Sequence, residues 1–219
     1  MTQAKLILED GSEYCGWSFG YEAAATGEVV FCTAMTGYPE CLTDPSYAGQ
    51  ILVMTYPIVG NYGVPPTGAD GNGLPLYTES GKIHVKGLVV ADYSPLCSHW
   101  NAQTTLSQWL QQEHVPAITG IDTRHLTIKL RGNGVMKGWI VRENPVDFTL
   151  PPYGSVNWVE QVSCKELITY SPAQPNGHSP KRPKTVVLVD CGVKANIIRC
   201  LLRRGVEVVR VPWDYDFSA

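Results

Sequence analysis

The sequence predicts an α/β fold in two unequal parts, and three observations support this. Apolar runs rich in β-branched residues, such as residues 51–54, recur over residues 1–150 and are typical of buried strands. Between them, apolar residues spaced three or four positions apart indicate helices, without a regular β-α-β alternation. Residues 185–211 have the pattern strand, helix, strand, which is the opening of a parallel doubly wound sheet.

Composition excludes several classes of protein. The 219 residues suit one complete domain plus something smaller, and 44% hydrophobic with 17% charged residues suits a globular core. The net charge of −3 gives no electrostatic reason to expect nucleic acid or an anionic membrane as a partner. No apolar run approaches the roughly 18 residues of a membrane span, and acidic residues come too early for a signal peptide. We therefore expect a cytoplasmic protein.

The cysteines predict neither a disulfide framework nor a metal site. Their number is seven, which is odd, and no CxxC pair or Cys/His cluster has metal-ligand spacing. Without an export signal they are expected to be reduced thiols, most of them small apolar fillers. They are Cys15, Cys32, Cys41, Cys97, Cys164, Cys191 and Cys200.

The first part, residues 1–150, is expected to mix strands and helices. Strands are predicted at residues 5–8, 13–18, 29–31, 51–54, 84–90 and 139–141. Asp10-Gly11 is a hairpin signal between the first two of these. Helices are predicted from Thr36, over residues 104–115 with Thr104 or Thr105 as N-cap, and from Asp122 to Gly132 or Gly134. Residues 64–82 are rich in Gly, Pro and Asp and predict a long surface loop.

A linker is predicted at residues 151–184, because residues 170–184 hold four prolines and no aliphatic residue larger than alanine. Residues 185–190 form a continuous apolar run, as in a strand buried on both faces. A helix over residues 195–204 and a strand over residues 206–211 follow it. One such unit cannot cover both faces of its strands, so the part at 185–219 is expected to be an incomplete domain and marginally stable alone.

Residues 27–63 are the stretch most suggestive of a site, because two apolar runs there flank a segment dense in Gly, Pro, Thr, Asp and Ser. Ser46 lies in its tightest polar turn. Its hydroxyl could be presented to a ligand, or it could stabilise the turn, in which Asp and Ser bond their own backbone. No GxSxG elbow surrounds Ser46, so a nucleophilic role is not supported.

Three other features carry weaker functional hypotheses. Cys191 follows an apolar strand and precedes a helix, where a thiol can become a nucleophile, but an inert thiol is the favoured interpretation because no G-x-C-x-G surrounds it. The turn at residues 192–196 could bind an anion through helix N–H groups, yet neither GxGxxG nor GxxxxGK[ST] is present. The five histidines are scattered and predict no site: His84, His99, His114, His125 and His178.

Three groups of residues carry a family resemblance. The first is GEVVF at 27–31, TAMTGY at 33–38, LTDPSY at 42–47, TYP at 55–57 and GN at 60–61. The second is GIDTR at 120–124 with LT at 126–127 and LR at 130–131. The third is Asp190, Gly192, Lys194, Asn196 and IIR at 197–199. Together they resemble the small, glutamine-hydrolysing subunit of carbamoyl phosphate synthetase, the third group being similar to the opening of a class I glutamine amidotransferase domain.

The resemblance implies a fold and a reaction. It implies a swivelling β/β/α-like N-terminal domain that docks on a large synthetase subunit, then the truncated start of a doubly wound amidotransferase domain at 185–219. In the family, glutamine is hydrolysed through a cysteine thioester with a histidine base. Ammonia then reaches the large subunit, which uses ATP and Mg²⁺ to make carbamoyl phosphate for pyrimidine and arginine synthesis. A heterodimer with that subunit is therefore expected, with no cofactor bound by this chain.

The resemblance also assigns residues. Ser46 matches the family's serine that contributes to the glutamine site. The family's nucleophile, its oxyanion-hole glycines and its histidine and glutamate partners have no counterpart before Ala219, so no catalytic residue is expected here. Cys191 stands where an aromatic residue is usual, Cys32 where Asn is common and Cys41 where an aliphatic residue is common. Two alternatives stay open: a docking module or degenerate paralogue without catalysis, and a stand-alone hydrolase using Cys191.

Overall fold

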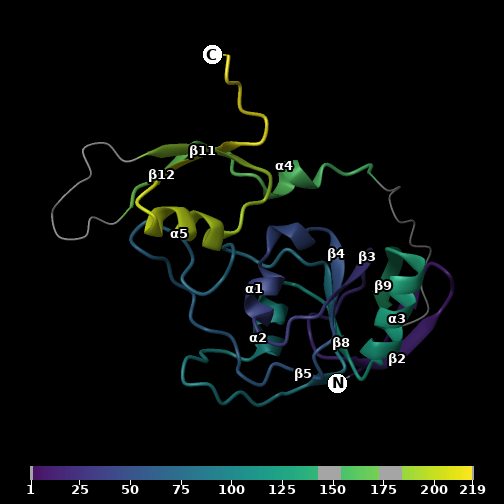
Figure 1. The fold of residues 1–219 in the computed structure, drawn as a ribbon. Coiled ribbons are helices and arrows are strands. Elements are labelled where there is room, and N and C mark those ends of the chain that lie inside the picture. Colours follow the sequence, from purple (N-terminus) through teal and green to yellow (C-terminus); the bar gives the residue numbers. More distant parts are fainter. Residues whose placement is uncertain (1, 143–153, 173–183, 219) are drawn as a thin grey trace.

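A closed barrel of seven strands forms the first part of the chain (Figure 1). The computed structural model describes residues 2–142, 154–172 and 184–218. Within these residues, the order around the barrel is β1-β2-β8-β6-β4-β3-β9. The bounds are β1 (Gln3–Leu8), β2 (Glu13–Ser18), β3 (Ala25–Cys32), β4 (Gln50–Met54), β6 (Gly87–Val89), β8 (Ala117–Thr119) and β9 (Met136–Val141). The neighbours β3, β4, β6 and β8 run parallel to one another, and the other pairs are antiparallel.

Strand β4 shows how the barrel divides the core. Ile51 and Val53 join the cluster on the inner faces of the strands, which α3 (Thr123–Asn133) also enters through Leu126. Leu52 and Met54 point the other way, into a cluster shared with α1 (Tyr38–Leu42) and α2 (Leu106–Gln112). No β4 residue from 51 to 54 exceeds 2% exposure, which confirms the predicted buried strand and shows that it is buried on both faces.

The predicted helix starts are confirmed at two caps. The Thr105 side chain accepts from Gln108 N and completes a capping box with the Gln108 side chain. The Asp122 carboxylate accepts from His125 N at 2.8 Å. The predicted strand at 84–90 is shorter than expected, since β6 covers only Gly87–Val89. A further pair, β5 (Ile58–Val59) with β7 (Asp92–Tyr93), lies outside the barrel.

A three-stranded sheet with order β10-β12-β11 lies at one end of the barrel (Figure 1). Its strands are β10 (Ile168–Tyr170), β11 (Thr185–Asp190) and β12 (Glu207–Pro212), and α5 (Ala195–Arg203) packs on one face. The strand-helix-strand prediction is confirmed, with β11 and β12 parallel. Burial of β11 on both faces was wrong. Val187 is 52% and Val189 43% exposed, because α5 covers only the opposite face and β11 is an edge strand.

The segment predicted as a linker contains regular structure. α4 (Trp158–Val162) and β10 both fall within 151–184, and β10 pairs with β12 through Ile168 opposite Arg210. Residues 173–183 and the boundary predicted at 150/151 lie outside the described residues. The division into domains therefore stays a prediction. Among the described residues, no helix has the length and apolar character needed to cross a membrane.

Asp190 holds the second part together at the end of β11. Its side chain is fully buried and accepts from Cys164 N at 2.5 Å and Val193 N at 2.9 Å. Arg210 on β12 pairs with the same carboxylate at 2.5 Å. Burial alone would raise the pKa of Asp190, but the two backbone N–H groups and the Arg210 guanidinium outweigh it and hold the pKa below its usual range.

The lowered pKa of Asp190 makes the stability of the folded chain depend on pH. A carboxyl group whose pKa is lower in the folded state than in the unfolded state stabilises the folded state. This stabilisation is complete above the unfolded-state pKa of about 3.9, and it is lost as the pH falls through the folded-state pKa. We expect Asp190→Asn to lose about 3 kcal/mol of unfolding free energy at pH 7, because Arg210 keeps a half-buried charge without its partner. Urea denaturation should show this difference shrinking below about pH 4.

Asp214→Asn is the matched control, because Asp214 is exposed. It should stay within about 0.5 kcal/mol of the unsubstituted chain at both pH values. A difference for Asp190→Asn that stays constant from pH 7 to pH 3 would contradict the proposed linkage.

Candidate functional site

The turn that carries Ser46 is stabilised by its neighbours. Asp44 caps the short 3-10 helix η1 (Pro45–Tyr47), and its carboxylate accepts from Ser46 N at 2.9 Å. Thr43 Oγ1 donates to Pro39 O at 2.7 Å, which fixes the start of the turn to α1. The predicted backbone bonding by Asp44 is therefore confirmed. The Ser46 side chain is exposed, and its hydroxyl has no hydrogen-bond partner among the described residues. This favours a hydroxyl presented to a ligand over one that stabilises the turn.

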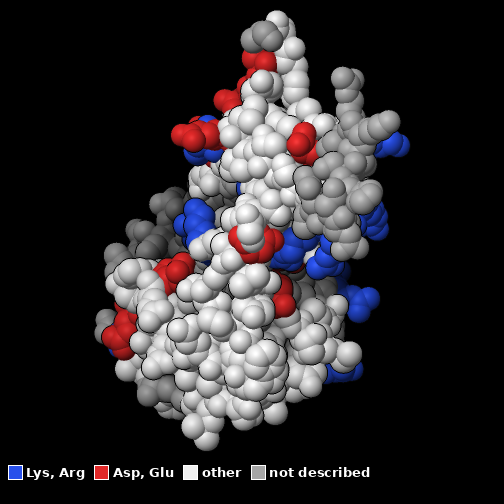
Figure 2. Space-filling view, turned by 90° about the vertical axis from the view of Figure 1, so that its left-hand side faces the viewer, with Lys and Arg blue, Asp and Glu red and all other residues white. Residues whose placement is uncertain are grey.

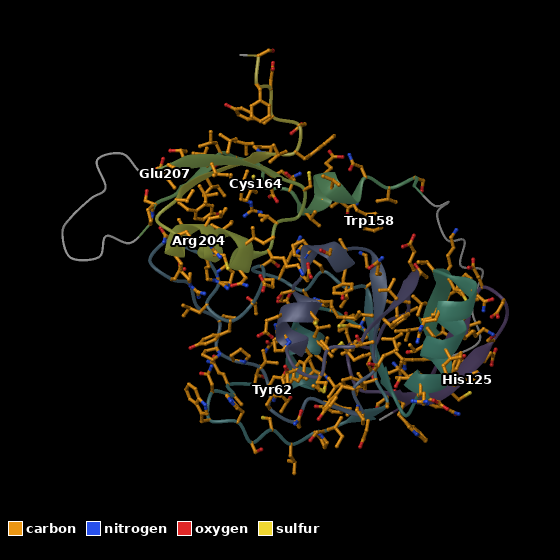
Figure 3. All side chains as sticks on the ribbon, in the orientation of Figure 1. Tyr62, His125, Trp158, Cys164, Arg204 and Glu207 are labelled. Atoms are coloured by element: carbon orange, nitrogen blue, oxygen red, sulfur yellow. The ribbon has the colours of Figure 1, made fainter. Side chains whose placement is uncertain are left out.

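Ser46 lines a cavity of about 420 Å³ between the end of the barrel and α4. Figure 3 labels Trp158 on α4, on the side of the helix that faces the barrel. Gly49 has φ +80°, and a Cβ there would lie 2.3 Å from the Trp158 ring, so only glycine allows this approach. The polar and charged lining residues are Thr26, Glu28, Ser46, Gln50, Lys86 and Lys137.

The cavity offers groups of both charges. Glu28 on β3 accepts a hydrogen bond from the Gln50 side chain at 3.3 Å and lies opposite Lys137 in the β3–β9 register. Lys86 lies just before β6, and its backbone N–H donates to Gln50 O. Carboxylate, ammonium, amide and hydroxyl groups therefore surround one space. Such a set can hold a small polar molecule that itself carries both charges.

The Ser46 turn is joined to the second part of the chain. Asp44 pairs with Lys194 at 2.5 Å, and this contact raises the pKa of Lys194. Glu79, from the loop at 64–82, caps α5 by accepting from Ala195 N and, through its carboxylate, from Asn196 N. Arg199 on α5 donates to carbonyl oxygens of the same loop, at 2.9 Å and 3.0 Å. The loop predicted from composition thus also connects the barrel to α5.

The suggested anion site at residues 192–196 is not available. Asp190 already accepts from Gly192 N and Val193 N. The backbone carbonyl of Glu79 accepts from Ala195 N and its carboxylate accepts from Asn196 N, so groups of the protein already occupy the place of an anion. No local sequence pattern indicates this contact, because Asn196 and Glu79 are 117 positions apart.

Cys191 lines the cavity, but nothing activates it. Its thiol is exposed, and no hydrogen bond or ion pair of the described residues reaches it. His84 has a structural role, because its Nε2 lies 2.9 Å from Ser80 Oγ. Burial lowers the pKa of His84 to about 4. His178 lies outside the described residues. The structure therefore brings Ser46 and Cys191 to one cavity, and no described residue serves as a base for the thiol.

Comparison with known proteins connects this site to a family. The chain is 49% identical over 217 residues to human "Carbamoyl-phosphate synthase [ammonia], mitochondrial", which is 98% of this chain and 14% of that protein. It is 48% identical over 213 residues to "Carbamoyl phosphate synthase small chain" of Pyrococcus furiosus, 96% of this chain and 56% of that one. "Multifunctional protein pyr1-3" of Dictyostelium discoideum is 43% identical over 222 residues, covering 98% of this chain and 10% of that protein.

The chain thus spans between a tenth and little more than half of these relatives. Among solved structures, an aminopeptidase from Aneurinibacillus sp. strain AM-1 aligns at a TM-score of 0.36 with 11% identity, over 95% of this chain and 50% of that one. That likeness is too weak to indicate a shared fold. Residues 6–140, which include the whole Ser46 turn, match the family described as "Carbamoyl-phosphate synthase small chain, CPSase domain". The chain belongs to the carbamoyl phosphate synthase small-chain family.

Proposed function

We propose that this chain forms part of the glutamine-hydrolysing unit of carbamoyl phosphate synthase, and that Ser46 helps to bind glutamine. The observation that carries the proposal is the free Ser46 hydroxyl, held by an Asp44-capped turn at the mouth of a cavity of about 420 Å³. Family membership supplies the reaction class. We assign binding, and not nucleophilic attack, to the residues of this cavity.

The cavity suits the chemistry of glutamine. A free amino acid carries an α-ammonium and an α-carboxylate, and glutamine adds an uncharged amide. Glu28 complements the α-ammonium group and Lys86 the α-carboxylate. The Ser46 hydroxyl can donate a hydrogen bond to, or accept one from, the groups at either end of the glutamine molecule. Trp158 closes the apolar side of the space and supplies a flat surface for the methylene groups.

We infer that the nucleophile comes from outside this chain. No described residue acts as a base for Cys191, which is expected to be inert. The thioester-forming cysteine and its histidine then belong to a segment that follows in the family. We propose that ammonia then passes to the synthetase part, where ATP and Mg²⁺ are bound, for carbamoyl phosphate used in pyrimidine and arginine synthesis. We place this work in the cytoplasm, although the human relative is named mitochondrial.

A surface without charge supports docking on that synthetase part. Residues 93–112 contain no Asp, Glu, Lys or Arg. Within them Trp100 is 86% and Leu96 82% exposed, values that are unusual for large apolar side chains. Figure 2 shows the middle of the barrel's face on this side without charged side chains, which lie along its edges and near the second part. Exposed tryptophan within an uncharged surface is typical of a protein–protein contact.

This surface also favours a second candidate function, that of a docking module without catalysis. Both functions need the contact through Trp100, and only the first needs Ser46. Substitutions at the two places therefore separate them.

Ser46→Ala, in the complete enzyme, should raise the KM for glutamine at least tenfold. A hydrogen bond to a charged group contributes about 1.5–3 kcal/mol, which corresponds to roughly 10- to 100-fold in affinity. Activity with ammonia as nitrogen donor should be unchanged, because that reaction bypasses the cavity. Steady-state kinetics with each donor measure both. Ser171→Ala, a change at an exposed serine away from the cavity, is the control. An unaltered KM for glutamine would exclude Ser46 from the site.

Trp100→Ala combined with Leu96→Ala should weaken binding to the separately produced synthetase chain at least tenfold, as expected for loss of two hot-spot side chains. Isothermal calorimetry measures this affinity. Both side chains are exposed, so the free energy of unfolding should change little. Ile128→Ala on α3, which removes a 60% exposed side chain elsewhere, is the matched control. Equal affinity for the double variant and the control would rule out this surface.

A further inference from the structure

Two cysteine thiols meet beside the Ser46 turn. Cys32 ends β3 and Cys41 lies in α1, and their Sγ atoms are 3.8 Å apart. All seven cysteines fall within the described residues and all are free thiols. A disulfide needs the two sulfur atoms at about 2.05 Å, so an approach of about 1.8 Å would join them.

The surroundings of this pair are partly apolar. Both side chains are half-buried against the apolar cluster that β4 shares with α1 and α2, and Tyr47 packs there as well. Burial and the neighbouring Cys32 thiol raise the pKa of Cys41 to about 12. Cys41 is therefore protonated at neutral pH and is a slow first nucleophile. Once Cys32 has reacted with an oxidant, however, Cys41 is already in contact with the sulfur that it must attack.

We propose that Cys32 and Cys41 are a redox modification site that forms an intramolecular disulfide by exchange with a small disulfide such as glutathione disulfide. In the first step the Cys32 thiolate attacks one glutathione sulfur, the glutathione S–S bond breaks, and one glutathione leaves. In the second the Cys41 thiolate attacks Cys32 Sγ and displaces the other glutathione. Two protein thiols are oxidised, one glutathione disulfide is reduced to two glutathiones, and both protons pass from protein to glutathione.

The bond would couple α1 to the barrel beside the candidate site. α1 leads through Thr43 and Asp44 to Ser46, and Asp44 N donates to Cys41 O. Shortening the Sγ–Sγ distance draws α1 toward the end of β3. It closes a short loop that contains Gly37, whose φ is +84°. The proposal of a modification site depends on the closeness of the two Sγ atoms, and it does not require that Ser46 bind glutamine.

The test uses the chain with all seven cysteines reduced. After incubation with glutathione disulfide at pH 8, remaining thiols are alkylated and the protein is cleaved after glutamate. Cleavage after Glu28, Glu40 and Glu79 places Cys32 and Cys41 on different peptides. We expect these two peptides to be linked in most molecules and to separate on reduction. The melting temperature should rise by roughly 3–8 °C, the size of effect expected from closing a short loop in a chain of this length.

Single variants give the controls. Cys41→Ser should leave Cys32 carrying bound glutathione with no link, whereas Cys32→Ser should leave Cys41 largely unmodified, because Cys41 is a slow first nucleophile. Cys97→Ser, a change at another partly buried cysteine, should leave the Cys32–Cys41 link intact. If Cys32 and Cys41 in the unsubstituted chain stay free, or carry only glutathione without a linked peptide, the proposal is overturned. A link that forms equally well between other cysteines overturns it as well.

Discussion

The carboxylate of Asp44 is the group on which the candidate site depends. It is 6% exposed, and burying a charge is costly unless hydrogen bonds and an opposite charge compensate it. Oδ1 accepts from Ser46 N and Oδ2 pairs with Lys194, so both oxygens are engaged. One of these contacts shapes the turn, and the other reaches the second part of the chain. Asp44 therefore links the Ser46 turn directly to the residue that precedes α5.

The barrel explains why that side chain is placed so firmly. β4 starts three residues after η1, and its residues 51–54 are buried on both faces of the sheet. The turn cannot shift without moving β4, which pairs with β3 on one side and β6 on the other. A packed interior resists such displacement because each small change in volume leaves voids or overlaps. The rigid scaffold thus holds an exposed hydroxyl in one place.

Local signals in the sequence predicted much of this architecture, and long-range contacts account for what was missed. The caps at Thr105 and Asp122 and the run at residues 51–54 depend on neighbours along the chain. Closure of the barrel depends on β9 pairing with both β1 and β3, which no local pattern encodes. The same holds at the site. The Asp44 turn was predictable from Asp-Pro-Ser, whereas the cap that Glu79 provides for α5 comes from the far end of a loop.

The contacts between the barrel part and α5 differ in how firmly they set the distance from the Ser46 turn to α5. The Lys194 side chain is 42% exposed, so water and salt weaken its attraction to Asp44. Glu79 and Arg199 instead bond backbone groups directly, one at the start of α5 and the other on carbonyl oxygens of the loop. Charge-assisted bonds to fixed backbone groups restrict orientation more than one solvated ion pair does. The loop at 64–82 therefore sets how the second part sits on the barrel, and the Asp44–Lys194 pair adjusts the turn within that arrangement.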